Sequence, residues 1–281
     1  MKKTVLLLIP ILLLGLICGC TGQAEAPRIA ATTLPVYQFT FRLCQGTDLT
    51  VTRLVTESVS CLHDYTLQVS QMRAIESAQA VLISGAHLEE FMEEALEKAD
   101  NVIDASADID LLPGEDHADP HIWLSPANAK IMAQNLCAGL KQQFPEYGDA
   151  FDANLTGLLA DLDALQRYGE DSLKELSCRE LITFHDGFAY FARAFDLTIL
   201  AAVEEESGSE ASAEELTWLI GLVKDRSLPA IFTETNGSDA AARVIAAETG
   251  AGIYTLDMAM SGDDYFEAMY HNIDTIKEAL G

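Results

Sequence analysis

Short apolar runs rich in β-branched residues alternate with longer helical patterns along this chain. Such alternation is typical of βα units built around a parallel sheet. One longer helical pattern begins at Pro145 and divides the alternation into two halves. It places large apolar residues at three- or four-residue steps, with acidic residues between them. We therefore predict an α/β fold with two lobes of parallel sheet flanked by helices and joined by one long spine helix.

Each half is expected to hold four strands and four helices. The strands are predicted at 28–33, 50–55, 80–84 and 101–104, then at 180–184, 197–203, 230–233 and 252–256. The helices are predicted at 35–44, 70–78 with Ser70 as N-cap, 87–98 and 126–143, then at 187–195, 213–224, 238–248 and 263–280. The expected divisions are an N-terminal lobe at 28–144, a connecting helix at 145–177 and a C-terminal lobe at 178–281.

The N-terminus has the pattern of an export signal. Two lysines precede the apolar run 4–18, and polar residues follow. The run is too short to favour a membrane-spanning helix. Ile17-Cys18-Gly19-Cys20 resembles a bacterial lipobox, which implies a signal peptide at 1–19, a linker at 20–27 and a lipid on Cys20. Ordinary secretory cleavage is the alternative. We expect a protein on the outer face of the cytoplasmic membrane, held by its lipid alone.

The chain is strongly acidic, with a formal net charge of −27 at pH 7. Such a surface repels phosphate backbones, so nucleic acids are not expected as partners. It raises the local concentration of cations, although acidity alone specifies no ligand.

Four cysteines remain besides Cys20, and in an exported protein they permit two disulfides with three possible connectivities. Cys44 ends a predicted helix, and Cys61 lies in the loop that leads to His63. We expect a Cys44–Cys61 bridge that would restrain this loop. Free buried thiols, or Cys61 as a soft metal ligand, are the alternatives.

Four separated residues have side chains suited to a divalent metal ion. They are His63, His121, His185 and Asp257. Three imidazoles and a carboxylate can fill a four-coordinate shell for a borderline-soft ion such as Zn²⁺. Two ligands belong to each half and follow predicted strands or lie in loops, where parallel α/β sheets bind ligands. The ion is therefore expected in the cleft between the lobes; if Asp257 is only a cap, Glu234 or Glu206 would supply the carboxylate.

The sequence around these residues resembles the metal-binding solute-binding lipoproteins of zinc and manganese ABC importers, over essentially the whole mature chain. The resemblance is carried by His63-Asp64-Tyr65, Asp119-Pro120-His121-Ile122-Trp123-Leu124-Ser125-Pro126, Phe184-His185-Asp186-Gly187-Phe188-Ala189-Tyr190-Phe191, Ile231-Phe232-Thr233-Glu234 and Leu256-Asp257. It implies two α/β lobes rigidly joined by a long helix, with metal ligands at His63, His121, His185 and Asp257. Many zinc-specific members have a long histidine-rich loop, whereas residues 114–119 are short and acidic with one histidine.

The resemblance implies a monomeric carrier, not an enzyme, that captures an extracytoplasmic divalent ion and passes it to an ABC permease and its ATPase. Zn²⁺ is the expected cargo because imidazole at His185 favours it over Mn²⁺; a manganese-specific protein is the alternative. Asp64, Asp119 and Asp186 could orient the neighbouring imidazoles. Histidine binds metal as the neutral ring, so affinity is expected to fall as pH drops through about 6.5.

Three other classes compete with the carrier. A secreted metallohydrolase would need an open metal position, and the chain lacks His-Glu-x-x-His and Gly-x-Ser-x-Gly motifs. A surface adhesin would bind its partner without the histidines. A binder of siderophores or cobalamin would need an aromatic or arginine-rich cleft. Four protein ligands around one ion leave no place for an activated water, which favours the carrier.

Overall fold

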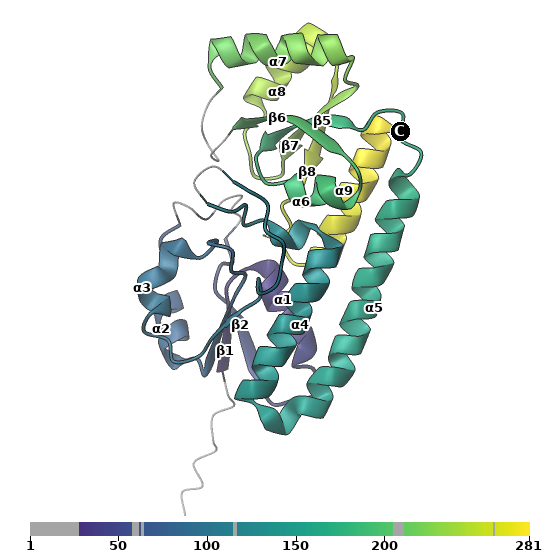
Figure 1. The fold of residues 1–281 in the computed structure, drawn as a ribbon. Helices are drawn as coiled ribbons and strands as arrows, with labels where there is room; N and C mark the ends of the chain where they lie inside the picture. The colour runs from purple at the N-terminus through teal and green to yellow at the C-terminus, as the bar shows by residue number, and fades with distance from the viewer. Residues whose placement is uncertain (1–27, 58–61, 63–64, 115–116, 205–210, 261) are drawn as a thin grey trace, which may run out of the picture.

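The computed structural model describes residues 28–57, 62, 65–114, 117–204, 211–260 and 262–281. Two four-stranded parallel sheets, each flanked by helices, lie at opposite ends of the part it describes (Figure 1). The predicted α/β class is therefore confirmed. The first sheet consists of β1 (Arg28–Ala31), β2 (Thr50–Arg53), β3 (Ala80–Ile83) and β4 (Val102–Asp104). The second consists of β5 (Glu180–His185), β6 (Thr198–Glu204), β7 (Ala230–Glu234) and β8 (Gly252–Leu256).

The two sheets have the same topology, with strand orders β2-β1-β3-β4 and β6-β5-β7-β8. In each sheet the first strand in sequence is second in spatial order. The next strand in sequence lies on one side of it, and the last two lie on the other side. All pairings are parallel, which brings the carboxyl ends of the strands to one edge of each sheet. The loops at these edges are where the predicted ligands fall.

The helices of the first half are α1 (Leu34–Leu43), α2 (Val69–Ser77), the 3₁₀ turn η1 (Glu90–Met92), α3 (Glu93–Leu96), the 3₁₀ turn η2 (Ile122–Leu124) and α4 (Pro126–Gln143). Those of the second half are α6 (Ala189–Ala194), α7 (Ala213–Arg226), α8 (Ala240–Thr249) and α9 (Tyr265–Leu280). Between them, the 3₁₀ turn η3 (Pro145–Tyr147) leads into α5 (Gly148–Leu173). With 26 residues, α5 is about 39 Å long.

Two long helices run between the halves. α5 lies along α4 and α1, and α9 returns from the second sheet beside α5 (Figure 1). Tyr265, the first residue of α9, is fully buried, and its ring meets that of Phe39 edge to face at a centroid distance of 5.0 Å. One hydrophobic cluster includes buried residues of both halves, among them Phe39, Trp123, Phe151 and Tyr265. The two sheets are therefore linked by continuous packing as well as by the chain.

The prediction of one helix over 87–98 is wrong. Gly85, Ala86 and His87 have φ values of +82°, +52° and +69°, and a right-handed helix cannot include this left-handed backbone. Only the short elements η1 and α3 form after it.

Ser70 is also not the N-cap that the sequence suggests. Gln68 holds that position, and its backbone N–H donates to the Gln71 side chain over 2.7 Å in a reciprocal capping box.

Within the described residues, no helix is both long and apolar enough to cross a membrane. The predicted signal peptide, the linker and Cys20 lie outside the described residues, as do Cys61, His63, Asp64 and Glu206. Cys44 is buried and forms no disulfide with another described cysteine. Its pairing with Cys61 stays a prediction.

Candidate metal centre

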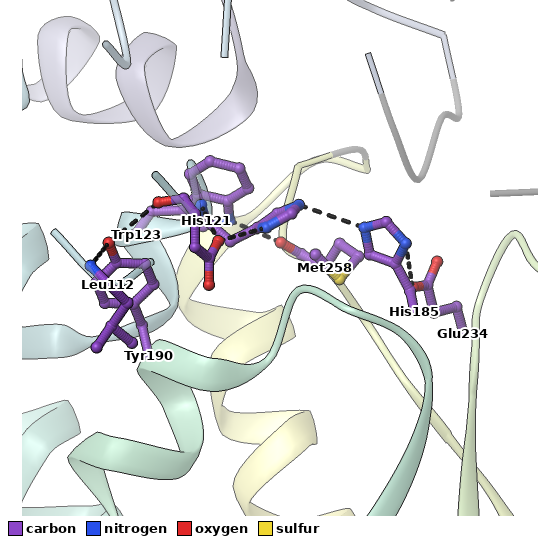
Figure 2. A network of polar contacts seen from close by, with 8 residues as sticks. Leu112, His121, Trp123, His185, Tyr190, Glu234 and Met258 are labelled. Carbon is purple, nitrogen blue, oxygen red and sulfur yellow. Dashed lines mark hydrogen bonds and ion pairs between the residues drawn. The ribbon is translucent and has the colours of Figure 1, made fainter. Parts of the chain in front are cut away.

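Two of the four predicted ligands meet between the sheets. His185 is the last residue of β5, and His121 directly precedes η2. Their Nε2 atoms lie 3.3 Å apart, and each residue is only 5% exposed (Figure 2). The rings stand nearly perpendicular, at an interplanar angle of 88°. The fold therefore brings together two imidazoles that are 64 residues apart.

The separation of the two Nε2 atoms suits a shared ion. Nitrogens bound to one Zn²⁺ at about 2.0–2.1 Å with tetrahedral angles lie about 3.3 Å from each other. The donor set also suits Zn²⁺, which imidazole binds well.

Asp119 determines the orientation of the first imidazole. Its Oδ1 accepts from the backbone N–H of His121 over 2.9 Å and lies 2.8 Å from the Nδ1 of the same residue. A carboxylate beside Nδ1 favours the tautomer that carries its proton there. The lone pair of His121 is then on Nε2, which faces His185. Asp119 is itself only 7% exposed, so water competes weakly for this bond.

The carboxylate of Glu234 lies beside Nδ1 of the second imidazole, that of His185. Glu234 is the last residue of β7, is 7% exposed, and its Oε1 lies 3.9 Å from the Nδ1 of His185 (Figure 2). This carboxylate therefore faces the ring nitrogen that points away from His121. Its position favours an orienting role for Glu234 over the ligand role that the sequence leaves open.

Asp257 directly follows β8 and is held at its backbone. Its N–H donates to Oδ1 of the fully buried Asn272 over 2.7 Å, and its carbonyl accepts from Nδ2 of Asn272 over 2.7 Å. One carboxylate oxygen, Oδ1, accepts from the N–H of Ala259 over 2.7 Å. The carboxylate thus caps the next turn with one oxygen, which leaves Oδ2 as the oxygen suited to an ion.

Gly187 lies beside the histidine pair and beside Met258, the residue after Asp257. A Cβ on Gly187 would lie 2.6 Å from Met258 Cε, 2.8 Å from His185 Cδ2 and 3.2 Å from His121 Cε1. A side chain at this position would therefore force Met258 and the imidazole of His185 to shift, and glycine leaves them in place. Gly187 was not predicted as a functional residue; the Phe-His-Asp-Gly stretch was the available signal.

Two buried aromatic residues also hold the site. Trp123 is fully buried, and its Nε1–H donates to the carbonyl of Met258 over 2.7 Å (Figure 2). Tyr190 of α6 is fully buried too. Its hydroxyl donates to the carbonyl of Asp119 over 3.0 Å and accepts from the N–H of Leu112 over 2.8 Å. Burial is the main cause that raises the pKa of Tyr190.

Asp186 is exposed, and its carboxyl group forms no hydrogen bond with the imidazole of a described histidine. Partial desolvation of that group, and then the charge of Asp119, raise its pKa, while His121 has the opposite effect.

The structure completes the predicted shell only in part. His63 lies outside the described residues. Among the described histidines, cysteines and acids, no third ligand atom lies within 4.8 Å of both central Nε2 atoms. Asp257 precedes Met258, whose Cε lies beside Gly187 next to the pair, and its own ligand role stays a prediction. The remaining histidines, His87, His117 and His271, are exposed.

Comparisons with known proteins identify the relatives of this chain. A family model described as zinc-uptake complex component A, periplasmic, matches residues 29–279. The zinc-binding lipoprotein AdcA of Streptococcus pneumoniae is 27% identical over 308 residues, which cover 99% of this chain and 61% of AdcA. The chain thus spans about three fifths of that relative's length. The manganese-binding lipoprotein MntA of Bacillus subtilis is 26% identical over 290 residues, covering 93% of this chain and 94% of MntA.

Solved structures share the fold. A crystal structure of ZnuA is 31% identical and superposes with a TM-score of 0.83, covering 92% of this chain and 100% of that one. The family model covers far more than half of the sequence, and the resemblance that the motifs indicated is confirmed. The chain therefore belongs to the family of the zinc-uptake complex component A.

Proposed function

We propose that this protein captures Zn²⁺ outside the cytoplasmic membrane and delivers it to the permease of an ABC importer. The observation that carries the proposal is the pair of buried Nε2 atoms 3.3 Å apart. Each imidazole has a carboxylate at its Nδ1, from Asp119 or Glu234. If each ring carries its proton on Nδ1, the lone pairs of the two Nε2 atoms face and repel each other. A cation bound between the two Nε2 atoms removes this repulsion.

The proposed shell comprises His63, His121, His185 and the Oδ2 atom of Asp257. Its donor chemistry favours zinc, since imidazole suits Zn²⁺ while Mn²⁺ suits oxygen ligands. The named relatives include both a zinc-binding and a manganese-binding lipoprotein, so a manganese carrier is the alternative. The domain division we propose is a lobe at 28–144, a connecting helix at 145–177 and a lobe at 178–281.

A carrier suits the site better than an enzyme does, and the family assignment agrees that the chain is a transport component. Ligands drawn from both halves would join the two lobes when the ion binds, and binding to the native state alone would stabilise the fold. Because packing is continuous between the halves, we propose that only local loops rearrange around the ion. Lipidation at Cys20 would keep the protein near its permease.

Competitive titration of the metal-stripped protein with Zn²⁺ and Mn²⁺ tests the proposal. We expect tight binding of one Zn²⁺ in the cleft and much weaker binding of Mn²⁺. His121→Ala, His185→Ala and Asp257→Asn should each weaken the tight event at least tenfold. His271→Ala, which changes an exposed histidine of α9, serves as the control. Tight binding that survives in His121→Ala would contradict the cleft site, and tighter binding of Mn²⁺ would favour the alternative.

Delivery is tested separately by uptake of radioactive zinc in cells that lack their own copy of the gene. The full chain should restore uptake, and His185→Ala should not. Cys20→Ala should reduce uptake without changing the affinity of the purified protein. Uptake that is restored equally by His185→Ala would contradict a role for the cleft in transport.

A further inference from the structure

A second group of metal-ligand side chains lies on the surface of the N-terminal half. It consists of His87, Glu90 and His117, which we call the surface triad. One ligand atom from each residue lies within 4.8 Å of the other two, and all three residues are exposed. Within the described part of the chain, this is the one group of three such side chains that converge so closely. It shares no residue with the cleft pair.

Two separate segments supply the triad. His87 Nδ1 lies 3.0 Å from Glu90 Oε1, a pairing that neighbours three residues apart can make alone. His117 comes from a different loop, and its Nε2 lies 3.7 Å from the same oxygen. The two imidazoles stack at a centroid distance of 4.9 Å and an interplanar angle of 13°. The imidazoles of His87 and His117 therefore both direct a nitrogen at Oε1 of Glu90. A simple surface ion pair would need only one of them.

The backbone that presents His87 is held in an uncommon conformation. Gly85, Ala86 and His87 are consecutive residues with positive φ, which is unusual for the latter two. The buried carboxylate of Glu89 accepts from the N–H of Gly85 over 3.0 Å, and the Ser106 hydroxyl accepts from that of Ala86 over 3.2 Å. The turn is thus fixed by its neighbours, and it points His87 toward the second loop.

Hydrogen bonds also hold the backbone of His117 and of its described neighbours. Pro113 and Ala118 form an isolated antiparallel bridge, and the N–H of Gly114 donates to the carbonyl of His117 over 2.8 Å. The N–H of Asp119 donates to the carbonyl of Leu112 over 2.9 Å. His117 is therefore held at its own carbonyl, and it lies four residues before His121.

The surroundings of the triad attract cations. His87 and Glu90 line an open surface pocket of about 430 Å³, together with the carboxylates of Glu93 and Asp104. Acids that line a concave surface raise the local concentration of positive ions. Two imidazoles and one carboxylate form a known three-ligand set for Zn²⁺, in which water fills the fourth position. Imidazole disfavours Mn²⁺ and Ca²⁺ as occupants.

We propose that the surface triad is a second Zn²⁺ site, separate from the cleft. Ligands on one Zn²⁺ lie about 3.3–3.5 Å apart, so small rotations of three exposed side chains bring them to bonding distance. The site binds more weakly and exchanges faster than the cleft site because its ligands are exposed and water completes its shell. It places a zinc ion on the loop that leads to His121.

Zinc titration of the full chain tests this site, with the metal-stripped protein competing against a fluorescent chelator. We expect two binding events in the wild-type protein. The variant His87→Ala/Glu90→Gln/His117→Ala should lose the weaker event and keep the tighter one. His121→Ala/His185→Ala should do the reverse. Glu93→Gln and His271→Ala are controls that change an exposed acid of the same pocket and a separate exposed histidine, and both should keep two events.

Nitrogen-15 spectra of the histidine rings give an independent readout in the His121→Ala/His185→Ala variant. Added Zn²⁺ should shift the ring nitrogens of His87 and His117 and leave those of His271 unchanged. A weaker event that survives in the triad variant would overturn the proposal, and so would a single wild-type event that only the cleft variant removes. A single event that only the triad variant removes would support the triad and contradict the cleft site, so the two proposals fail separately.

Discussion

The indole nitrogen of Trp123 donates to the carbonyl oxygen of Met258 over 2.7 Å, across 135 residues of sequence. Trp123 lies two residues after His121, and Met258 directly follows Asp257. The bond thus joins the segments that carry two proposed ligands, one from each half of the chain. It acts together with the Tyr265 hydroxyl, which donates to the carbonyl of Trp123 over 2.7 Å.

Trp123→Phe should therefore weaken both the fold and metal binding. The variant leaves the Met258 carbonyl without its buried donor, which costs about 1–3 kcal/mol of unfolding free energy. Zinc affinity should fall several-fold because the segment of Asp257 is less firmly held. Urea unfolding and zinc titration measure the two effects. Trp218→Phe is the matched control, since Trp218 on α7 is 55% exposed, and it should change neither quantity.

Asp119→Asn should reduce zinc affinity while the fold persists. The amide no longer favours a proton on Nδ1 of His121, so the lone pair on Nε2 is less available to the ion. Loss of such a partner lowers metal affinity by about 10–100-fold. Asp110→Asn is the control, because the side chain of Asp110 is 95% exposed and pairs with Arg193 on the surface. Equal zinc affinity in Asp119→Asn and wild type would refute the orienting role.

Gly187→Ala should weaken zinc binding because the new methyl group would push His121 and His185 apart. We expect a loss of at least tenfold in zinc affinity, measured by competitive titration. Gly221→Ala is the control: a Cβ at Gly221, within α7, meets no atom within 4 Å. That variant should leave zinc affinity unchanged and raise the unfolding free energy by about 0.5–1 kcal/mol, since alanine favours a helix.

Glu89 should make stability depend on pH. Burial raises the pKa of its carboxyl group from 4.5 to about 7, against the opposing effect of donors from Thr32, Ser84 and Gly85. Between these values the folded state holds more protons than the unfolded state. The contribution of Glu89 to the unfolding free energy therefore falls as pH rises from about 4.5 to about 7.

Urea unfolding of the metal-free protein between pH 4.5 and 8 measures this contribution as the difference between wild type and Glu89→Gln. The unfolding free energy of the wild type, relative to that of Glu89→Gln, should fall by roughly 3 kcal/mol as pH rises through this window. Glu93→Gln, an exposed neighbour on α3, should show no such shift. A difference for Glu89→Gln that is constant with pH would show that its pKa is not raised.

The sequence predicts the fold well where local and global signals agree. Apolar runs bounded by turn residues predict each strand to within two residues at either end, and Pro126 after Ser125 predicts the start of α4, where Ser125 Oγ accepts from the N–H of Asn128. The segment from His87 onward is different. Its composition favours a helix, but the backbone N–H groups of Gly85 and Ala86 donate to Glu89 and Ser106 and hold the preceding backbone left-handed. The bond to Ser106 spans 20 residues, and Glu89 is buried by tertiary packing, so the local sequence pattern does not predict this turn.

For the site, motifs point to His121 and His185, and the structure brings them together. The partners of their Nδ1 atoms are harder to predict. Asp119 is two residues from its imidazole and could be suggested from sequence, whereas Glu234 reaches His185 only because β7 pairs with β5. Gly187 contributes to the site because it has no side chain to displace the neighbouring imidazoles. The surface triad forms because the fold brings together two loops that are separate in the sequence.

The central claim is that one zinc ion binds between the halves at His121 and His185. A crystal structure of the zinc-loaded protein, with anomalous data at the zinc edge, tests it most directly. We predict an anomalous peak about 2.0–2.1 Å from Nε2 of both histidines, with His63 and Asp257 completing the shell. A zinc-loaded crystal whose tightest-bound ion lies elsewhere, with no peak between these two nitrogens, would contradict the account.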